Sequence, residues 1–456
     1  MSDFDYDVIV LGGGSAGSSA AAAAQAGGAK TLMINDGELG GLCILRGCMP
    51  TKSMLAAAHV IHEAQHLEPF GARLKGEVEV DFEAIVDRKD GHVARFKKAK
   101  VDSIEAQSYH LLDARAHFID AHTVQAGDRT LRARSFVIAT GSTPTTLAID
   151  GIEEVPVWNS DDVMRLREAP RRLLVQGAGP IGLELAQFFA RIGTEVRLVN
   201  RSPLLAKGDA EAGRELQAAL DDEPRLQVDA PGSIEKLEPH GDGLVATLAD
   251  GERFEADALL MAIGRRAALD ELGLDAAGVT VERNVVPHNE AMQTNQSHIY
   301  VAGDSTGRYQ ILHLANAEGR VAGHNAAGGE TRQIDYRLKM SVIFSDPPFA
   351  QVGMDEDEAR AAGHDPVIGR ARFPETGRAI TMETQHGLWK LLVDRKDGRI
   401  LGSSILGPRA DDLIHIISTM MHFDGNIDEI ERMPWYHPTL SEVALNLYRD
   451  IQRQRT

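Results

Sequence analysis

Residues 8–17, Val-Ile-Val-Leu-Gly-Gly-Gly-Ser-Ala-Gly, place a short apolar run directly before a glycine-rich turn. The apolar run predicts a buried strand, and the alanine-rich Ser15–Ala26 predicts a helix behind it. Gly12, Gly14 and Gly17 give the spacing Gly-x-Gly-x-x-Gly at the junction. This spacing is typical of a dinucleotide site. Its first glycine permits the tight turn, the second lets the backbone approach a pyrophosphate, and the third lets helix and strand pack closely.

The same pattern occurs a second time in the chain. The segment GGGSAGSSAAAAAQAGGAKTLMIND aligns without a gap with GAGPIGLELAQFFARIGTEVRLVNR, so the three glycines fall on Gly177, Gly179 and Gly182. Strands are expected before and after this second helix, over Arg172–Gln176 and Glu195–Val199. One such turn can serve helix packing alone. Two in the same strand–helix–strand context predict two separate dinucleotide sites in one chain.

The residues that end the second strand of each copy indicate its nucleotide, since an acid there binds a ribose 2′-hydroxyl and an arginine accepts a 2′-phosphate. In the first copy Asn35 occupies the usual acid position, so Asp36 or a water must compensate, and the site is compatible with FAD. The second copy has Asn200 and Arg201 with no acid, which favours NADPH over NADH. The alternative for Arg201 is a solvated loop arginine.

The two cysteines of the chain, Cys43 and Cys48, lie just after the first copy. Pro50 suits the first turn of a following helix, so Cys48 is expected near a helix N-terminus, where the partial positive charge lowers a thiol pKa. Lys52 lies four residues on and therefore on nearly the same helical face. Gly47 lets the short loop bend enough to close a disulfide. We therefore predict a redox-active pair and not two buried, inert cysteines.

Length and charge limit the class of protein. With 456 residues the chain exceeds the ~250–300 residues at which single cores stop growing, which predicts several domains. Its net charge of -19 disfavours nucleic acid and anionic membrane surfaces as partners. The N-terminus carries acids where a signal peptide carries lysines, and no stretch approaches the ~20 apolar residues of a membrane span. We expect a cytoplasmic protein, and two cysteines are too few for the usual zinc site, so no metal is expected.

The stretch GGLCILRGCMPTK resembles the signature of the class I pyridine nucleotide-disulfide oxidoreductases, the family of dihydrolipoamide dehydrogenase, glutathione reductase and mercuric reductase. The likeness runs through ATGS, GAGPIGLE, AIGR and YVAGD to HPTLSE, over essentially the whole chain. It implies an α/β fold with two Rossmann-like dinucleotide-binding domains, for FAD and NAD(P), and an α+β C-terminal dimerisation domain. The expected boundaries are 1–145 with 265–330 for FAD, 146–264 for NAD(P), and 331–456 for dimerisation.

The resemblance also implies roles for individual residues. Cys48 would be the thiol against the flavin, and Cys43 would be the interchange thiol that attacks substrate. Lys52 would lie near the flavin N5 and pair with Glu184. The implied cofactor-binding residues are Gly12, Gly14, Ser15, Ala16, Gly17, Asn35, Asp36, Gly41, Lys52, Thr140, Gly141, Gly177, Gly179, Gly182, Asn200, Arg201, Gly264 and Asp304, the last on the FAD ribityl chain.

Near the C-terminus, His437 would be the catalytic base, with Glu442 orienting it. The family's histidine reaches the cysteines of the other subunit, so the resemblance implies a homodimer. The reaction expected is dihydrolipoyl dehydrogenase-like, on a free or protein-bound lipoyl group. The alternative is an NADPH-dependent reductase of another small disulfide, like glutathione reductase or mercuric reductase.

Some features distinguish these alternatives. Asn200 replaces the glutamate typical of NAD-using dihydrolipoamide dehydrogenases, and the surrounding stretch is closer to mercuric reductases. Against mercury, no cysteine follows Cys48, so a C-terminal thiol pair is lacking. Pro180 stands where many relatives carry a tyrosine, which puts nicotinamide gating in question. A flavoprotein oxidase or transhydrogenase, or a flavin-bearing protein without turnover, are the remaining readings.

Overall fold

The computed structural model describes residues 4–455. Contacts divide these residues into two compact units. The first comprises the residues up to Ser53, Asp87–Thr145 and Gly264–Asp335, and the second comprises Met54–Val86, Thr146–Ile263 and the residues from Tyr336 onward. The second unit holds both the second glycine-rich copy and the C-terminal residues, so contacts alone do not separate the two domains expected there. None of the described helices is long and apolar enough to cross a membrane.

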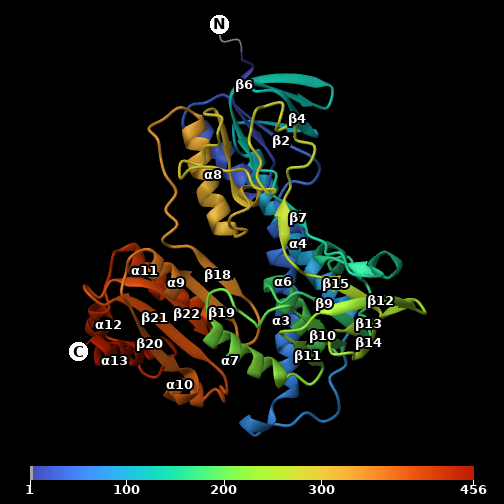
Figure 1. The fold of residues 1–456 in the computed structure, drawn as a ribbon, viewed down its shortest axis with the longest axis vertical. Helices are drawn as coiled ribbons and strands as arrows, with labels where there is room; N and C mark the ends of the chain where they lie inside the picture. The colour runs from blue at the N-terminus through green and yellow to red at the C-terminus, as the bar shows by residue number, and fades with distance from the viewer. Residues whose placement is uncertain (1–3, 456) are drawn as a thin grey trace. The chain divides into compact units, whose positions relative to one another are not determined.

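The first unit is built on a sheet in the order β3-β2-β1-β6-β5-β4, with β17 paired to β6 (Figure 1). Its strands are β1 (Tyr6–Leu11), β2 (Thr31–Asn35), β3 (His110–Asp113), β4 (Ala116–Asp120), β5 (Thr123–Ala126), β6 (Arg129–Ile138), β17 (Ile299–Val301) and the separate pair β7 (Ser142–Pro144) and β16 (Arg265–Ala267). Its helical segments are α1 (Ser15–Ala26), α2 (Gly41–Leu45), the start of α3 (Cys48–Gln65), most of α4 (Phe82–Glu105), η3 (Gly303–Thr306) and α8 (Leu312–Ala326).

Helix α1 is rich in alanine because α8 packs against it at close range. A Cβ at Gly319 would lie 2.2 Å from the carbonyl oxygen of Ala16, and a Cβ at Gly323 would lie 2.7 Å from Cα of Ala20. Such separations leave no room for side chains, so glycine on one helix and alanine on the other are both required. The predicted helix over Ser15–Ala26 is confirmed, with the same bounds.

The second unit begins with a parallel sheet in the order β11-β10-β9-β15-β8. These strands are β8 (Val157–Trp158), β9 (Arg172–Gln176), β10 (Glu195–Val199), β11 (Leu226–Asp229) and β15 (Ala258–Met261), and β12 (Ile234–His240), β13 (Gly243–Leu248) and β14 (Arg253–Ala256) form an antiparallel sheet. The helical segments are η1 (Glu68–Phe70), η2 (Ile152–Glu154), α5 (Ser160–Val163), α6 (Pro180–Arg191) and α7 (Ala210–Asp221). The strands predicted at 172–176 and 195–199 are confirmed.

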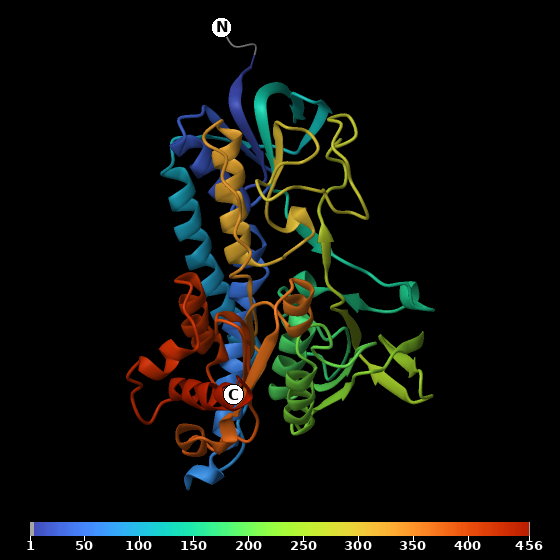
Figure 2. The ribbon, with the colours of Figure 1, turned by 60° about the vertical axis from the view of Figure 1, so that its left-hand side comes forward.

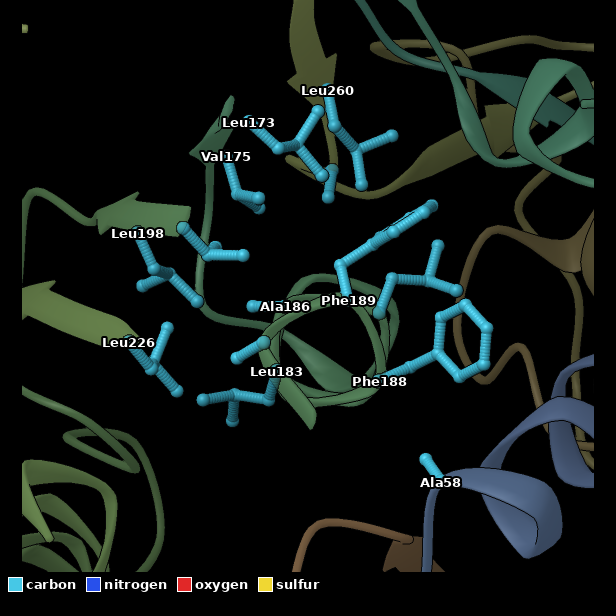
Figure 3. Packing of buried hydrophobic residues seen from close by; sticks show 14 of the residues in the cluster. Ala58, Leu173, Val175, Leu183, Ala186, Phe188, Phe189, Leu198, Leu226 and Leu260 are labelled. Carbon is cyan, nitrogen blue, oxygen red and sulfur yellow. The ribbon is translucent and has the colours of Figure 1, made fainter. Parts of the chain in front are cut away.

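Helix α6 is buried almost all round, unlike a surface helix. Figure 3 shows the helix with Leu183 on the side of Leu226, and with Phe188 on the side of Ala58 from α3. Phe188 and Phe189 are fully buried. Each buried phenylalanine contributes about 1.5–3 kcal/mol to folding, so this helix is a main element of the second core.

The C-terminal residues form an antiparallel sheet in the order β18-β19-β22-β21-β20. The elements are β18 (Met340–Ile343), β19 (Phe349–Gly353), α9 (Glu356–Ala361), β20 (Pro366–Arg372), η4 (Phe373–Glu375), α10 (Gly377–Ile380), β21 (Leu388–Asp394), β22 (Ile400–Leu406), α11 (Ala410–His422), α12 (Asp428–Arg432), η5 (Ser441–Val443) and α13 (Ala444–Arg455). Helices α11 and α13, red in Figure 2, pack on this sheet over a core that includes Trp389 and Phe373. The strands and late helices expected after residue 331 are confirmed.

Candidate active site

Three segments of the first unit meet at one edge of its sheet. Leu11 at the end of β1 lies beside Ile138 of β6, and Ile138 lies beside Val301 of β17. The chain therefore leaves all three parallel strands at the same edge, which is where open α/β sheets bind ligands. A Cβ at Gly303 would lie 2.8 Å from Cβ of Ala16, so the start of α1 approaches the segment after β17. The predicted residues brought together here are Gly12, Gly14, Ser15, Ala16, Gly17, Thr140, Gly141 and Asp304.

The glycines of the first turn are required for different reasons. Gly12 has φ +111°, and a Cβ there would lie 2.2 Å from the carbonyl oxygen of Ala139. A Cβ at Gly17 would lie 1.8 Å from the carbonyl oxygen of Gly12. Gly14, by contrast, has an ordinary φ of −73°, and its Cβ would meet nothing nearer than 3.8 Å. The protein itself does not require glycine at 14, so the free space in front of the α1 N-terminus fits a pyrophosphate.

The second turn repeats this arrangement. A Cβ at Gly177 would lie 2.6 Å from the carbonyl oxygen of Ala262, and a Cβ at Gly182 would lie 1.8 Å from that of Gly177. Gly179 has φ −76° and no atom within 4 Å of the Cβ position. The space in front of α6 is therefore also free for a phosphate group, and the residues present fit two dinucleotides.

The asparagines at the acid positions brace their own glycine turns. Oδ1 of Asn35 accepts a hydrogen bond from the Gly13 N–H at 2.8 Å, and its Nδ2 donates to the Gly37 carbonyl at 2.8 Å. Oδ1 of Asn200 accepts from the Ala178 N–H at 3.1 Å, and its Nδ2 donates to the Ser202 carbonyl at 2.5 Å. Both amides thus bond to the loop backbone, and the residues that follow them, Asp36 and Arg201, are exposed, so their contact with a ribose stays a prediction.

The cysteine pair spans the junction of two helices. Cys43 lies in α2, and Cys48 is the first residue of the 18-residue α3, so the expected position at a helix N-terminus is confirmed. A Cβ at Gly47 would lie 3.0 Å from the Leu42 carbonyl oxygen, so the connecting loop is tightly folded. A hydrogen bond to Cys48 and burial raise the pKa of the Cys43 thiol, while the charge of Lys52 lowers it. A thiolate on Cys48 would be stabilised by the partial positive charge at the N-terminus of α3.

The C-terminal segment presents an imidazole backed by a carboxylate. Nδ1 of His437 lies 3.0 and 3.1 Å from the two carboxylate oxygens of Glu442. Glu442 also accepts from the Thr439 N–H at 3.3 Å, which fixes its orientation. The His437 side chain is 76% exposed, and the neighbouring Tyr436 is 83% exposed. Because Nδ1 faces the carboxylate, Nε2 is the nitrogen available to accept a proton.

Family models match most of the chain. Residues 6–319 match the model described as pyridine nucleotide-disulphide oxidoreductase, and residues 340–447 match the dimerisation domain of the same enzymes. The chain belongs to the pyridine nucleotide-disulphide oxidoreductases. Membership in this flavoprotein family implies FAD and a nicotinamide nucleotide as cofactors, and the C-terminal match supports a homodimer. The resemblance drawn from the cysteine signature is thus confirmed.

Individual relatives of this oxidoreductase carry different names. It is 35% identical to a dihydrolipoyl dehydrogenase of Thermus scotoductus, over 98% of both chains. It is 33% identical to a mercuric reductase of Lysinibacillus sphaericus, over 99% of this chain and 84% of that one. Among solved structures, the HOCl-induced flavoprotein disulfide reductase RclA from Escherichia coli superposes with a TM-score of 0.85 at 26% identity, covering 97% of this chain and 99% of that chain.

Two expected site residues of the oxidoreductase fall in different units. Lys52 belongs to the first unit and Glu184 to the second, so their pairing stays a prediction. Glu184 is only 2% exposed, and its Oε1 accepts a hydrogen bond from the Phe344 N–H at 3.0 Å. A carboxylate buried in this way is costly without partners, so Glu184 is not an ordinary surface residue.

Sequence reasoning missed several side chains around Asp304. Its Oδ2 accepts a hydrogen bond from the Ser142 hydroxyl at 2.6 Å, and Arg265 binds Ser142 in turn. The predicted residues Thr140 and Gly141 contact Ser305, whose Oγ accepts from the Gly141 N–H at 2.8 Å. These partners follow the strand ends in sequence, and that position was the available signal. The predicted Gly264 has φ +108° and marks the return of the chain to the first unit.

Proposed function

We propose that the chain is an FAD-dependent dithiol/disulfide oxidoreductase of the dihydrolipoyl dehydrogenase type. The observation that carries this proposal is the cysteine pair, with Cys43 in α2 and Cys48 at the start of α3, where the hydrogen bond to Cys48 and burial raise the pKa of the Cys43 thiol. A thiol whose pKa is raised needs a base before it can attack a disulfide. The carboxylate-backed His437 is a base of the required kind.

Residues of each glycine-rich copy would hold one nucleotide. The turn from Gly12 and the Asp304 carboxylate would bind FAD, and the turn from Gly177 with Arg201 would bind NAD(P). Bound FAD supplies electron transfer between the nicotinamide and the cysteine pair. The protein's task is then to place the disulfide beside the flavin and to manage one proton per thiol.

Thiol exchange on the cysteine pair accounts for the substrate step. One thiolate of a substrate dithiol attacks the sulfur of Cys43 in the Cys43–Cys48 disulfide, and Cys48 leaves as a thiolate at the helix N-terminus. The second substrate thiol then attacks the mixed disulfide, which releases substrate disulfide and leaves Cys43 reduced. His437 takes up the substrate proton through Nε2, and Glu442 stabilises the resulting imidazolium. The substrate loses two electrons and the cysteine pair gains them.

The exposure of His437 supports a homodimer. A base that is 76% exposed in the single chain has no cleft around it within its own C-terminal segment. A second copy that places its cysteines against this imidazole would complete the site, and the dimerisation match supports such an assembly. Because the pair must cycle through a free dithiol, we also propose that the enzyme works in a reducing compartment, the cytoplasm.

A second candidate is an NADPH-dependent reductase of another low-molecular-weight disulfide. The observation that favours it is Arg201, which follows Asn200 with no acid nearby in the same loop. The mercuric reductases among the relatives and RclA, which one solved structure describes as a Cu(II) complex, make thiophilic metal ions further acceptors to test.

The deciding experiment compares dihydrolipoamide oxidation by the purified protein with NAD and with NADP. Fast turnover that is lost in Cys43→Ser supports the lipoyl proposal. His437→Gln should lower turnover by roughly 10²–10⁴-fold while flavin reduction by NAD(P)H stays unchanged. His117→Gln, an exposed histidine on β4, is the matched control and should retain full activity.

Other outcomes separate the alternatives. If protein that binds FAD and reduces its disulfide shows no lipoyl turnover, the lipoyl proposal is wrong, and oxidised glutathione, Hg²⁺ and Cu²⁺ with NADPH are the next acceptors. If Cys43→Ser and His437→Gln leave every activity intact, the disulfide mechanism is wrong as a whole.

A further inference from the structure

Two short strands carry the chain out of the first unit and back into it. Strand β7 (Ser142–Pro144) ends just before Thr145, where the first unit gives way to the second, and β16 (Arg265–Ala267) follows Gly264, where the chain returns. They pair antiparallel, with Ser142 opposite Ala267. These two strands form a double linker at the edge of the proposed flavin site.

Side chains of the double linker reach the buried carboxylate of Asp304. Arg265 Nε donates to the Ser142 hydroxyl at 2.9 Å, and its Nη2 donates to the Ser142 carbonyl at 3.0 Å. The Ser142 hydroxyl in turn donates a hydrogen bond to Oδ2 of Asp304 at 2.6 Å. These hydrogen bonds form a relay in which each group donates to the next, from the Arg265 guanidinium to the Ser142 hydroxyl and from the hydroxyl to the Asp304 carboxylate.

This relay counteracts the cost of burying Asp304. Burial raises the pKa of the Asp304 carboxyl, whereas the hydrogen bond from Ser142 and the charge of Arg265 lower it. The relay also uses one carboxylate oxygen, Oδ2, in a fixed direction. Because the hydrogen bond from Ser142 occupies Oδ2, a ligand hydroxyl that approaches Asp304 would donate to Oδ1.

We propose that Arg265 and Ser142 are positioning residues for the flavin, which hold Asp304 ionised and oriented so that it binds the hydroxyl-bearing chain of FAD. The inference rests on the proposed role of Asp304 and extends it to the double linker. Because the relay belongs to both linker strands, FAD binding and the order of the linker are coupled. By linkage, whatever strengthens one strengthens the other.

The neighbouring Arg266 shows that charge on this strand need not act in this way. Arg266 donates to Asp270 at 2.6 Å in an exposed i,i+4 pair, which is worth little to stability. Arg266 thus provides a control with the same charge, on the same strand, without a route to Asp304. If Arg265 merely fastened the strands, its loss would lower the melting temperature and leave FAD affinity alone.

The test is FAD binding to the full-length apoprotein, measured by quenching of flavin fluorescence. A hydrogen bond to a charged group contributes enough that Ser142→Ala and Arg265→Met should each weaken FAD binding by about 10–100-fold. Arg266→Met should stay within about twofold of wild type. The double variant should bind FAD no more weakly than the weaker single variant, because both residues act through the same carboxylate oxygen. Arg265→Lys, which keeps the charge, should recover part of the affinity.

Hydrogen exchange provides the second readout. Adding FAD to wild type should slow exchange in β7 and β16, and this protection should disappear in Ser142→Ala. Unchanged FAD affinity in Arg265→Met, or additive losses of affinity in the double variant, would overturn the inference. If Arg265→Met does not fold, the deciding result is hydrogen exchange in β7 and β16 of wild type: a rate that FAD does not change would overturn the inference. Wild-type protein that binds no FAD contradicts the proposed function itself. Wild-type-like binding by Asp304→Asn contradicts the role of Asp304, and with it this inference, but not the proposed function.

Discussion

The two glycine-rich copies share one backbone design but differ in what covers their helices. In the first copy α1 carries small residues, because α8 approaches it closely enough for Gly319 to face the Ala16 backbone. In the second copy α6 carries Phe188 and Phe189, which fill a core with residues of α3. The glycine turn that leaves space for a phosphate therefore depends only on its glycines and on the asparagine that braces it, Asn35 or Asn200. The rest of each helix is free to follow whichever element packs on it.

The copies also differ at the far ends of their helices. Helix α1 ends at Ala26, and the backbone N–H of the following Gly27 donates to the Ala23 carbonyl at 3.1 Å. Helix α6 ends at Arg191, which is 6% exposed and pairs with Glu223 at 2.6 Å and with Asp346 at 2.9 Å. Two histidines of α3, His59 and His62, flank this buried network. Titratable groups therefore surround this end of α6, whereas the last turn of α1 carries no basic residue.

The largest effect is expected from side chains that fill the space in front of each glycine turn, one turn at a time. Gly14→Val and Gly179→Val should each fold, because a Cβ at neither position would clash with the protein, but should block the space for the phosphates. Gly14→Val should weaken FAD binding by at least about 100-fold. Gly179→Val should retain FAD, but the reduction of its flavin by NAD(P)H should be slower by a similar factor. Flavin absorbance and anaerobic flavin reduction measure the two losses. Loss of FAD in Gly179→Val would contradict two independent sites.

The next largest effect is expected from replacing Arg201, the residue that follows the bracing Asn200. Arg201→Ala should lower the preference for NADP(H) over NAD(H) by about 10–100-fold, since a charged hydrogen bond to the 2′-phosphate is lost. The measurement is kcat/KM for both nucleotides, with FAD content as a check on the first copy. Arg225→Ala, an exposed arginine at the opposite end of the same parallel strands, is the matched control. An unchanged ratio would identify Arg201 as a solvated loop residue.

Acid should loosen the second copy before the first. Burial and the charge of Arg191 lower the pKa of His62 from 6.5 to about 4. The folded state binds this proton less readily than the opened state. The contribution of His62 to stability is therefore full above about pH 6.5 and falls by about 1–2 kcal/mol as the pH drops toward 4, after allowance for partial exposure. The pKa of His59, which the hydrogen bond with Asp346 raises, offsets part of this loss.

Hydrogen exchange at pH 7 and pH 5 measures this difference between helices. Exchange in α6 should accelerate by about 5–30-fold relative to α1, and His62→Phe should remove the acceleration. The pKa of the Asp346 carboxyl is lowered in the folded state. The stability that Asp346 contributes is therefore lost only when the pH falls below the pKa of an aspartate in the unfolded chain, about 4, which lies outside the range from pH 7 to pH 5. Equal acceleration in α1 would show that acid acts on the whole chain and not on this network.

Removing the brace asparagines should give the smallest effect. Asn35→Ala and Asn200→Ala each delete two hydrogen bonds within a loop whose backbone remains solvated nearby, so about 1 kcal/mol or roughly fivefold in affinity is expected for the corresponding cofactor. Titration of FAD and of NAD(P)H against each variant measures it. Asn289→Ala, whose side chain braces a turn remote from both glycine motifs, should change neither affinity.

Much of the local structure was predictable from the sequence. The helix over Ser15–Ala26, the strands at 172–176 and 195–199, and the placement of Cys48 at a helix N-terminus all follow from periodicity and turn chemistry within a few residues. The family followed from one compact cysteine signature. Such features depend on neighbours along the chain, so their physical causes are visible in the sequence itself.

The sequence by itself thus determined the two glycine turns, the cysteine pair and the order of elements. Only the tertiary structure decided that Asn35 and Asn200 brace their loops, that Glu184 is buried against Phe344, and that Arg265 reaches Asp304 through Ser142. Ser142 and Asp304 are brought within 2.6 Å only because distant strands pair in a particular register. Hydrogen-bond partners of buried groups depend on that register, and residue type does not encode it.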